Sequence, residues 1–186
     1  PTAVVGKIRA LKSPLLSPFK QRPCVAYGYN IDCERQIRSR STTTNDTSTT
    51  TTKDMLMGGF AMTPCAVRTS TADVKILGFA MPSEFPEDWF LAVEYRQQID
   101  AHRASTTFDQ SGFNPAKMFS QLKNVFNEDD GELQEHWCTD SLESRMEDYP
   151  DQTRCKEQIV PEGSDVCVIG SWSAAKNGLL GDIAQG

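Results

Sequence analysis

The sequence of 186 residues contains no run of about 20 apolar residues, the length that a helix needs to cross a bilayer. Its six cysteines include no Cys-x-x-Cys pair, which argues against zinc-finger and thioredoxin-like sites. The 19 Lys and Arg residues are scattered and are outnumbered by 25 Asp and Glu, so the net charge is -6. Without a basic stripe, we expect no nucleic-acid partner and no direct adsorption to an anionic membrane surface.

Groups that could carry catalysis are scarce, because the sequence has only two histidines, His102 and His136. A histidine base needs a nucleophile and an orienting carboxylate close in space, and neither histidine lies in a motif that supplies them. We interpret both as exposed or helix-capping residues. His136, Cys138 and Asp140 lack the second ligand pair of a metal site, and the acidic pairs lack the spacing of an EF-hand loop. We expect no catalytic residue, no metal and no cofactor.

The cysteines leave two interpretations open, because their even number fits either free buried thiols or a full set of disulfides. A chain of this length can bury a core without disulfides. Cys24 follows Pro23 on the small face of a strand pattern, where a thiol behaves as a small hydrophobic group. Asn45-Asp46-Thr47 fits a glycosylation acceptor, which matters only for a secreted chain.

Alternation of side chains with a period of two residues predicts a mainly β chain. The clearest strand covers residues 25–33, where one face is large and apolar and the other is small or polar. Residues 2–11 predict another strand with one buried face. Further strands are predicted over residues 61–68, 74–79, 153–160 and 165–172. We interpret Gly58-Gly59 and residues 178–181 as turns, because neither has the residues of a phosphate-binding loop.

An insertion over residues 83–151 differs from the β pattern, because it is helical and acidic. Pro86-Glu87-Asp88 suits a first helical turn and predicts a helix over residues 83–103, with a strand over 89–95 as the alternative. Asn114-Pro115 and an apolar stripe predict a second helix over 115–126. Residues 127–151 are interpreted as an acidic surface excursion with at most one short helix.

Residues 39–54 are rich in Ser and Thr and have no apolar side chains to bury, so they predict a flexible hairpin loop. Taken together, the elements predict one domain over residues 1–186. Its fold class is mainly β, a closed or partly open β-barrel or sandwich with one or two inserted helices, and an OB-type barrel is one form that fits.

Three separated stretches carry motifs in a matching order and spacing. Gly6-Lys7-Ile8 precedes a Leu-Leu-Ser-Pro-Phe segment at 15–19 and an Arg-Pro-Cys-Val-Ala-Tyr strand at 22–27. The match over residues 59–77 is weaker, because the Asp-x-x-Gly turn that belongs to the motif there is absent. Residues 157–170 follow the pattern Glu-x-Ile-x-Pro-x-Gly-x-x-Val-x-Val-x-Gly. These stretches resemble the beside-a-membrane domain of membrane-anchored ubiquitin ligases of the GIDE/MULAN type and of their prokaryotic relatives.

The resemblance implies a domain that flanking helices outside this chain hold next to a bilayer. It further implies a position on the lumenal, intermembrane or extracytoplasmic side and a binding role there. The family's ligase activity belongs to a separate RING domain whose paired cysteines are absent here, so no activity is carried over. Because residues 2–8 already read as a strand, we expect a longer parent protein that continues on one or both sides.

An extended apolar segment, residues 14–19, lies beside the only mildly basic stretch and suits a lip that contacts another surface. The alternative is a segment that crosses between strands and packs on the core. We expect a groove beside residues 14–27, covered by the 115–126 helix, that accepts a protein segment or an apolar ligand near a membrane. The candidate binding residues are Pro14, Leu15, Pro18, Phe19, Arg22 and Tyr27.

The function expected from the sequence is a non-catalytic, membrane-proximal binding domain of a membrane-anchored parent. A secreted, disulfide-bonded surface protein is one alternative. A hydrolase that pairs a histidine with a cysteine or serine is another, and it would place a histidine within hydrogen-bond reach of a nucleophile in a cleft.

Overall fold

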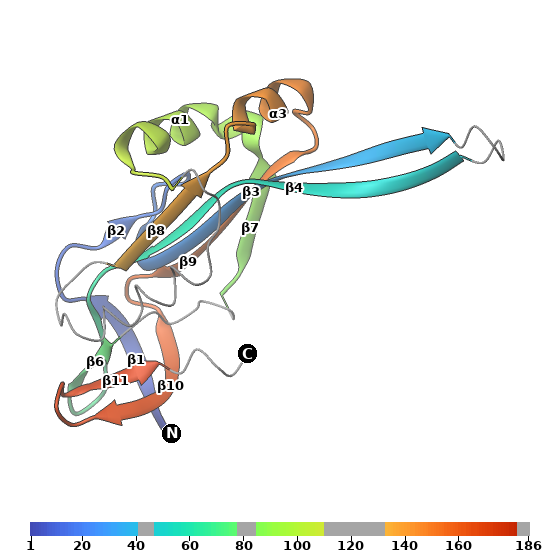
Figure 1. Cartoon of the computed structure of the whole chain (residues 1–186). Coiled ribbons are helices and arrows are strands. Elements are labelled where there is room, and N and C mark those ends of the chain that lie inside the picture. Colours follow the sequence, from blue (N-terminus) through green and yellow to red (C-terminus); the bar gives the residue numbers. More distant parts are fainter. Residues whose placement is uncertain (41–46, 78–84, 110–132, 182–186) are drawn as a thin grey trace.

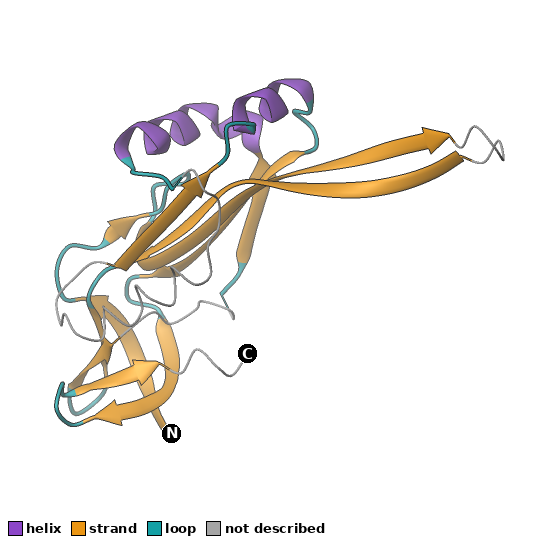
Figure 2. Cartoon of the chain, viewed as in Figure 1, coloured by secondary structure: helices purple, strands orange, loops and turns teal. Residues whose placement is uncertain are grey.

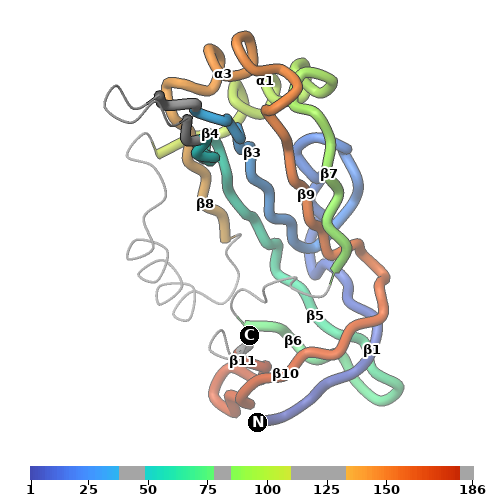
Figure 3. The backbone as a smooth tube through the Cα atoms, turned by 90° about the vertical axis from the view of Figure 1, so that its right-hand side faces the viewer, coloured from blue at the N-terminus to red at the C-terminus, as the bar shows by residue number. Residues whose placement is uncertain are grey.

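The computed structural model describes residues 1–40, 47–77, 85–109 and 133–181. A small β-barrel forms one end of the molecule, a larger sheet forms its middle, and helices cover the far end of that sheet (Figure 1). Figure 2 shows how little of the described chain is helical, and Figure 3 shows the same three-part order from the side. The prediction of a mainly β fold with a closed barrel and inserted helices is confirmed.

The barrel closes in the order β1, β10, β11, β6, β5. Its strands are β1 (Thr2–Ala10), β5 (Cys65–Arg68), β6 (Asp73–Leu77), β10 (Asp165–Ser173) and β11 (Gly178–Gly181). The first and last predicted strands are direct neighbours, since Val4 of β1 pairs with Val168 of β10. Residues 178–181 are a strand, so the prediction of a turn there is wrong. Gly178 brings β11 against β6, because a Cβ at this position would lie 2.7 Å from the Leu77 side chain.

The larger sheet has the order β7, β9, β3, β4, β8, with β2 paired to the start of β3. Its strands are β2 (Leu15–Leu16), β3 (Pro23–Arg40), β4 (Thr47–Met62), β7 (Glu87–Leu91), β8 (Leu133–Cys138) and β9 (Thr153–Pro161). The predicted strand at 25–33 is therefore part of this sheet and not of the barrel. Val25, Met62 and Val160 from this sheet join the barrel's apolar core, which connects the two units.

β3 and β4 continue past the sheet as a two-stranded arm (Figure 1). Their pairing runs as far as Arg40 opposite Thr47. The prediction of a loop over residues 39–54 is wrong for 39–40 and 47–54, which belong to β3 and β4, because β-branched threonines favour extended backbone. Residues 41–46, including Asn45, lie outside the described residues.

The insertion contains strands that its composition concealed. Glu87–Leu91 is β7, and the helical part follows as η1 (Ala92–Tyr95) and α1 (Arg96–Ser105). The predicted helix start at Pro86 is wrong, because residues 87–91 pair with β9 and this pairing overrides the local first-turn chemistry. Residues 133–138 form β8 and not a surface excursion, whereas the single short helix expected there is α3 (Leu142–Asp148). The helix predicted over 115–126 lies outside the described residues.

A second apolar core lies between the larger sheet and the helices, and it includes Phe19, Tyr29, Ile99 and Leu142. All six cysteines are free thiols, and Cys167 is the exposed one. Cys24 is buried, as expected. No helix in the described part of the chain combines the length and apolarity that a membrane span requires.

Candidate binding site

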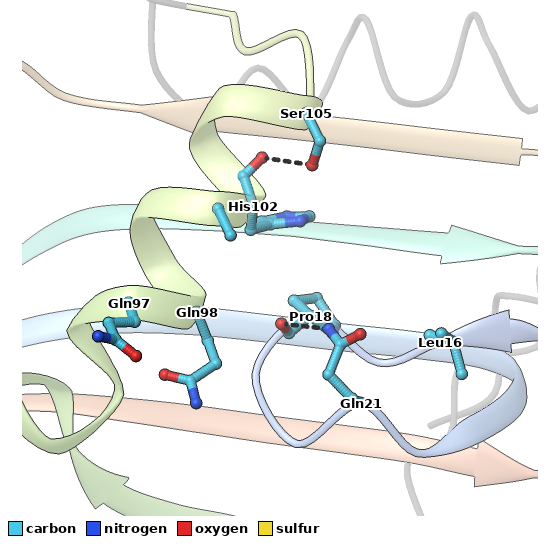
Figure 4. A pocket seen from close by; sticks show the side chains of 8 residues that line it. Leu16, Pro18, Gln21, Gln97, Gln98, His102 and Ser105 are labelled. Atoms are coloured by element: carbon cyan, nitrogen blue, oxygen red, sulfur yellow. Dashed lines mark hydrogen bonds between the residues drawn. The ribbon is translucent and has the colours of Figure 1, made fainter.

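A pocket of about 570 Å³ lies between the loop that follows β2 and one face of α1 (Figure 4). Its loop wall lies within residues 14–27, beside which a groove was expected, and the helix expected to cover that groove lies outside the described residues. The residues of α1 that line the pocket are separated by three, four or eight positions, which places them on one face of the helix. Every lining residue within the described part of the chain is uncharged. The loop contributes Leu16, Pro18 and Gln21, and the helix contributes Gln97, Gln98, Ala101, His102 and Ser105.

The loop wall of the pocket is fixed by a buried carboxylate, Glu157 of β9, whose side chain is 0% exposed. Its oxygens accept hydrogen bonds from the Phe19 backbone N–H at 2.9 Å and from the Ser17 hydroxyl at 3.2 Å. The Arg22 guanidinium lies 3.6 Å away and also pairs with Asp88. A buried charge is tolerated only with such partners, so Glu157 and the loop hold one another in place.

Gln21 braces the tip of this loop. Its backbone has a positive φ of 53°, in the left-handed region. Its side-chain amide donates to the carbonyl oxygens of Ser17 at 3.0 Å and Pro18 at 2.9 Å, the second of which is drawn in Figure 4. These bonds use the local side-chain chemistry that stabilises tight turns. The pocket's loop wall is therefore shaped before any ligand arrives.

A chain of hydrogen bonds runs from the helix wall of the pocket into the sheet. Thr106 Oγ1 lies 3.2 Å from Nδ1 of His102, and Nε2 of His102 lies 3.0 Å from the Tyr29 hydroxyl. The same hydroxyl lies 3.0 Å from Nδ1 of His136 on β8. The rings pack closely, and Phe108 contacts both imidazoles edge to face. We call Thr106, His102, Tyr29 and His136 the histidine–tyrosine chain.

Burial keeps the histidine–tyrosine chain uncharged at neutral pH. It lowers the pKa of His102 to about 4. Burial, together with the charge that His102 would carry, also lowers the pKa of His136 to about 4. The pKa of Tyr29 is raised well above its ordinary value, mainly by burial. His102 therefore presents a neutral imidazole to the pocket, which makes the whole lining neutral.

Our interpretation of the two histidines as exposed or capping residues is wrong. His136 is only 5% exposed, and His102 is half-buried against Tyr29. No local pattern signals this, because Tyr29 lies 73 residues before His102 and 107 residues before His136. His136 Nε2 has no hydrogen-bond partner among the described residues.

The six candidate binding residues have separate roles. Pro18 lines the pocket. Phe19 and Tyr27 are buried in the core, so the alternative of a core-packed segment holds for them. Arg22 makes ion pairs with Asp88 and Glu157, and Pro14 and Leu15 lie outside the pocket lining. The large aromatic rings of this segment are buried in the core and are not available for a surface contact.

The residues that the sequence analysis missed lie on α1, namely Gln97, Gln98, Ala101, His102 and Ser105. Their helical spacing was available as a signal, but nothing local indicated which face the loop would meet. Within the described part of the chain, no group of three or more His, Cys, Asp and Glu side chains is arranged to hold a metal ion.

Comparisons with protein-family models, with curated proteins and with solved structures found no match. The resemblance to the beside-a-membrane domain therefore stays a prediction, and the function is argued from the geometry of the pocket.

Proposed function

We propose that this chain is a non-catalytic binding domain whose pocket, between the 16–21 loop and α1, accepts a segment of another protein. The neutral lining carries this proposal. Gln97 and Gln98 each offer a donor and an acceptor, which match the N–H and C=O groups of a peptide main chain. Leu16, Pro18 and Ala101 provide apolar surface for a side chain. A purely apolar ligand would leave the carboxamides without partners, which favours a peptide.

A binding role fits the state of the reactive groups better than a hydrolase does. Both ring nitrogens of His102 are engaged by hydroxyls, those of Thr106 and Tyr29, so no carboxylate occupies the orienting position of a catalytic triad. Neither of these two hydroxyls belongs to a residue of the pocket lining. Burial raises the pKa of the Cys24 thiol to about 12, which suppresses its thiolate.

The domain is further proposed to lie beside a membrane, on the extracytoplasmic side of a membrane-anchored parent. Support comes from the way the two strongest resembling stretches meet. Ser17 and Phe19 of the first bind Glu157 of the third, and Cys24 of β3 pairs with Pro161 of β9. In the proposal, these contacts are the reason why both motifs occur together. Protease protection of the intact parent in its native membranes tests the location, and cleavage of this domain from the cytoplasmic side would refute it.

Peptide binding can be tested by selecting random peptides displayed on phage against the full chain and measuring the enriched peptides by calorimetry. Ala101→Trp fills the pocket and is expected to weaken binding about tenfold or more, which is about 1.4 kcal/mol or more. Ala104→Trp is the matched control, because Ala104 is exposed on the same helix and is not part of the lining. Enriched peptides that bind both variants equally well, or a selection that enriches none, would refute the pocket as the binding site.

A further inference from the structure

We propose that this protein pairs with a second copy of itself through the outer end of β4, residues 47–55, so that the arms of the two copies join edge to edge. The pairing is separate from the peptide pocket and would stand without it. It follows from an edge of β4 that has no neighbouring strand, and from the different charges on the two edges of the arm.

The outer end of β4 has a neighbouring strand on one side only. On the other side, the pairing with β8 stops at Met57 opposite Cys138, and the Leu56 carbonyl oxygen accepts one more bond, from the Thr139 N–H at 2.8 Å. Over residues 47–55 no described strand lies on that side, and the arm projects away from the body (Figure 1). Alternate residues of an antiparallel strand point their N–H and C=O groups away from the partner strand. This edge therefore offers a row of donors and acceptors to another strand.

The two edges of the arm differ in how well they are protected against such pairing. Proteins protect exposed edges with charged side chains, prolines and bulges. The β4 run over residues 47–52 consists only of Ser and Thr, it pairs with β3 without a bulge, and the threonines at 49–51 are exposed. β-branched threonine also favours a strand. The β3 run over residues 34–40 has four charged residues, Glu34, Arg35, Arg38 and Arg40. The open edge of the arm is therefore that of β4.

A second copy of the chain fits the β4 edge because the run is nearly uniform. Antiparallel pairing of two identical Ser/Thr runs places a hydroxyl residue opposite a hydroxyl residue wherever the runs overlap, and such cross-strand pairs are favourable. The joined arms have the strand order β3, β4, β4, β3, so both outer edges are the charged β3 strands. These edges resist the addition of a further strand, and the assembly closes at two copies related by a two-fold axis.

The contact is expected to be weak. Stable interfaces bury about 1,200 Å² or more, and paired edges over residues 47–52 bury less. The gain for each copy is a set of backbone hydrogen bonds to an arm that is otherwise a two-stranded hairpin, a structure of marginal stability in water. Because the paired strands run in opposite directions, the two bodies lie at opposite ends of the joined arms.

Sedimentation velocity of the full chain over a range of concentrations tests the association. We expect a concentration-dependent equilibrium between monomer and dimer, without larger species. A chain that stays monomeric up to its highest soluble concentration would overturn the proposal, and the β4 edge would then be open to a strand of a different protein. Growth beyond the dimer would contradict the protection of the outer edges by β3.

Proline variants locate the contact. Two residues directly opposite each other in an antiparallel ladder point their N–H groups either both inward or both outward, and neighbouring pairs alternate. Thr50 lies opposite Ile37 and Thr51 lies opposite Gln36, so one of these pairs points outward. In that pair a proline on either strand removes no bond within the arm. Only the proline on β4 removes a donor from the proposed interface.

The four variants are Thr50→Pro with its matched control Ile37→Pro, and Thr51→Pro with its matched control Gln36→Pro. In one of the two pairs, the β4 proline is expected to weaken the dimer about tenfold or more, because each copy loses a donor, while the β3 proline leaves it unchanged. If the β3 and β4 prolines have equal effects in both pairs, or if no variant weakens the dimer, the proposal is overturned.

Hydrogen exchange provides a measurement without any variant. Alternate backbone amides over residues 47–52 are expected to exchange more slowly at concentrations where the dimer forms than in dilute solution. The amides over residues 35–40 are expected to exchange at the same rate in both. Slower exchange on the β3 edge, or a dimer that protects neither edge of the arm, would show that the copies meet through a different surface and would overturn the proposal.

Discussion

The Tyr29 hydroxyl and Nδ1 of His136 lie 3.0 Å apart although a whole strand separates their backbones. Tyr29 is on β3 and His136 is on β8, and Gly59 of β4 is paired with both. Strands two positions apart in a sheet are separated by about 10 Å, so the tyrosine must reach over the intervening residue. Gly59 permits this contact because it has no side chain.

Gly59→Ala is expected to break this contact. An added Cβ would lie 2.4 Å from Nδ1 of His136 and 2.6 Å from the Glu135 carbonyl oxygen. Overpacking of this kind costs about 1–3 kcal/mol of unfolding free energy, measurable by urea denaturation. Gly28→Ala on β3 is the control, since among the described residues its Cβ would meet only the Gly59 carbonyl oxygen, at 4.0 Å, and it should cost much less. Equal losses in the two variants would contradict the steric explanation.

Glu157→Gln is expected to loosen the loop wall of the pocket. The amide keeps one acceptor oxygen and turns its NH2 group either toward the Phe19 N–H or toward the Ser17 hydroxyl and Arg22. Unsatisfied buried donors cost about 1–3 kcal/mol. Hydrogen exchange of the loop amides should also speed up. The exposed Glu162→Gln should change stability by less than about 0.5 kcal/mol, and a loss as large as that of Glu157→Gln would argue against the buried anchor.

Acid is expected to destabilise the fold through its histidines. An unfolded histidine takes up a proton near its ordinary pKa of 6.5, whereas His102 and His136 do so in the folded protein at a pKa of about 4. Between these values the unfolded state binds more protons, so stability is fully present above about pH 6.5 and is lost as the pH falls toward 4. The loss is at most about 3 kcal/mol for each imidazole, and solvent screening makes the share of half-buried His102 smaller.

Urea denaturation at several pH values measures this loss. His136→Gln should flatten the dependence between pH 6.5 and 4, since only His102 then remains to be protonated. The pKa of Asp73 is lowered mainly by its hydrogen bond to Arg68, so such carboxylates affect stability at lower pH. Their effect is the same in the wild type and in His136→Gln and cancels when the two are compared. A wild type whose stability rises on acidification would contradict the burial of neutral imidazoles.

Thiol titration distinguishes a protein with six free thiols from the disulfide-bonded alternative. In the native protein only Cys167 is exposed, so one thiol should react rapidly with an aromatic disulfide reagent. The other five are buried, and burial raises the pKa of Cys24 and Cys65 to about 12, so they should react only after unfolding. All six should then be counted without any reductant. A smaller count in the unfolded chain would reveal disulfides.

The sequence predicted the elements whose evidence is local. The polarity of residues 2–11, 25–33 and 153–172 alternates because each strand has one buried face. This pattern can be read without knowing which strands are neighbours. β7 was predicted only as the alternative, a strand over 89–95, because Pro86 to Asp88 matches a helix start; the pairing with β9, some 65 residues further on, makes it a strand. Such long-range pairing leaves no trace in a local pattern.

One wall of the candidate site could be predicted from the sequence, and the other could not. The loop was singled out from its Pro-Leu-Leu-Ser-Pro sequence at 14–18, and Pro18 lines the pocket. The helix wall and the contacts of Tyr29 with His102 and His136 depend on which elements meet in three dimensions. The apolar rings of Phe19 and Tyr27 were assigned to a surface because a single sequence does not distinguish an apolar lip from a core segment.

The two-stranded arm constrains the order in which the strands pair during folding. Its outer half, from Glu34 opposite Lys53 outward, carries polar side chains apart from the exposed Ile37, and a repetitive threonine strand specifies its pairing only weakly. A slip by one residue would turn Tyr29 to the wrong side of the sheet. The correct alignment must therefore be set near Tyr29 and Gly59, and the hairpin is expected to zip from the body toward its tip.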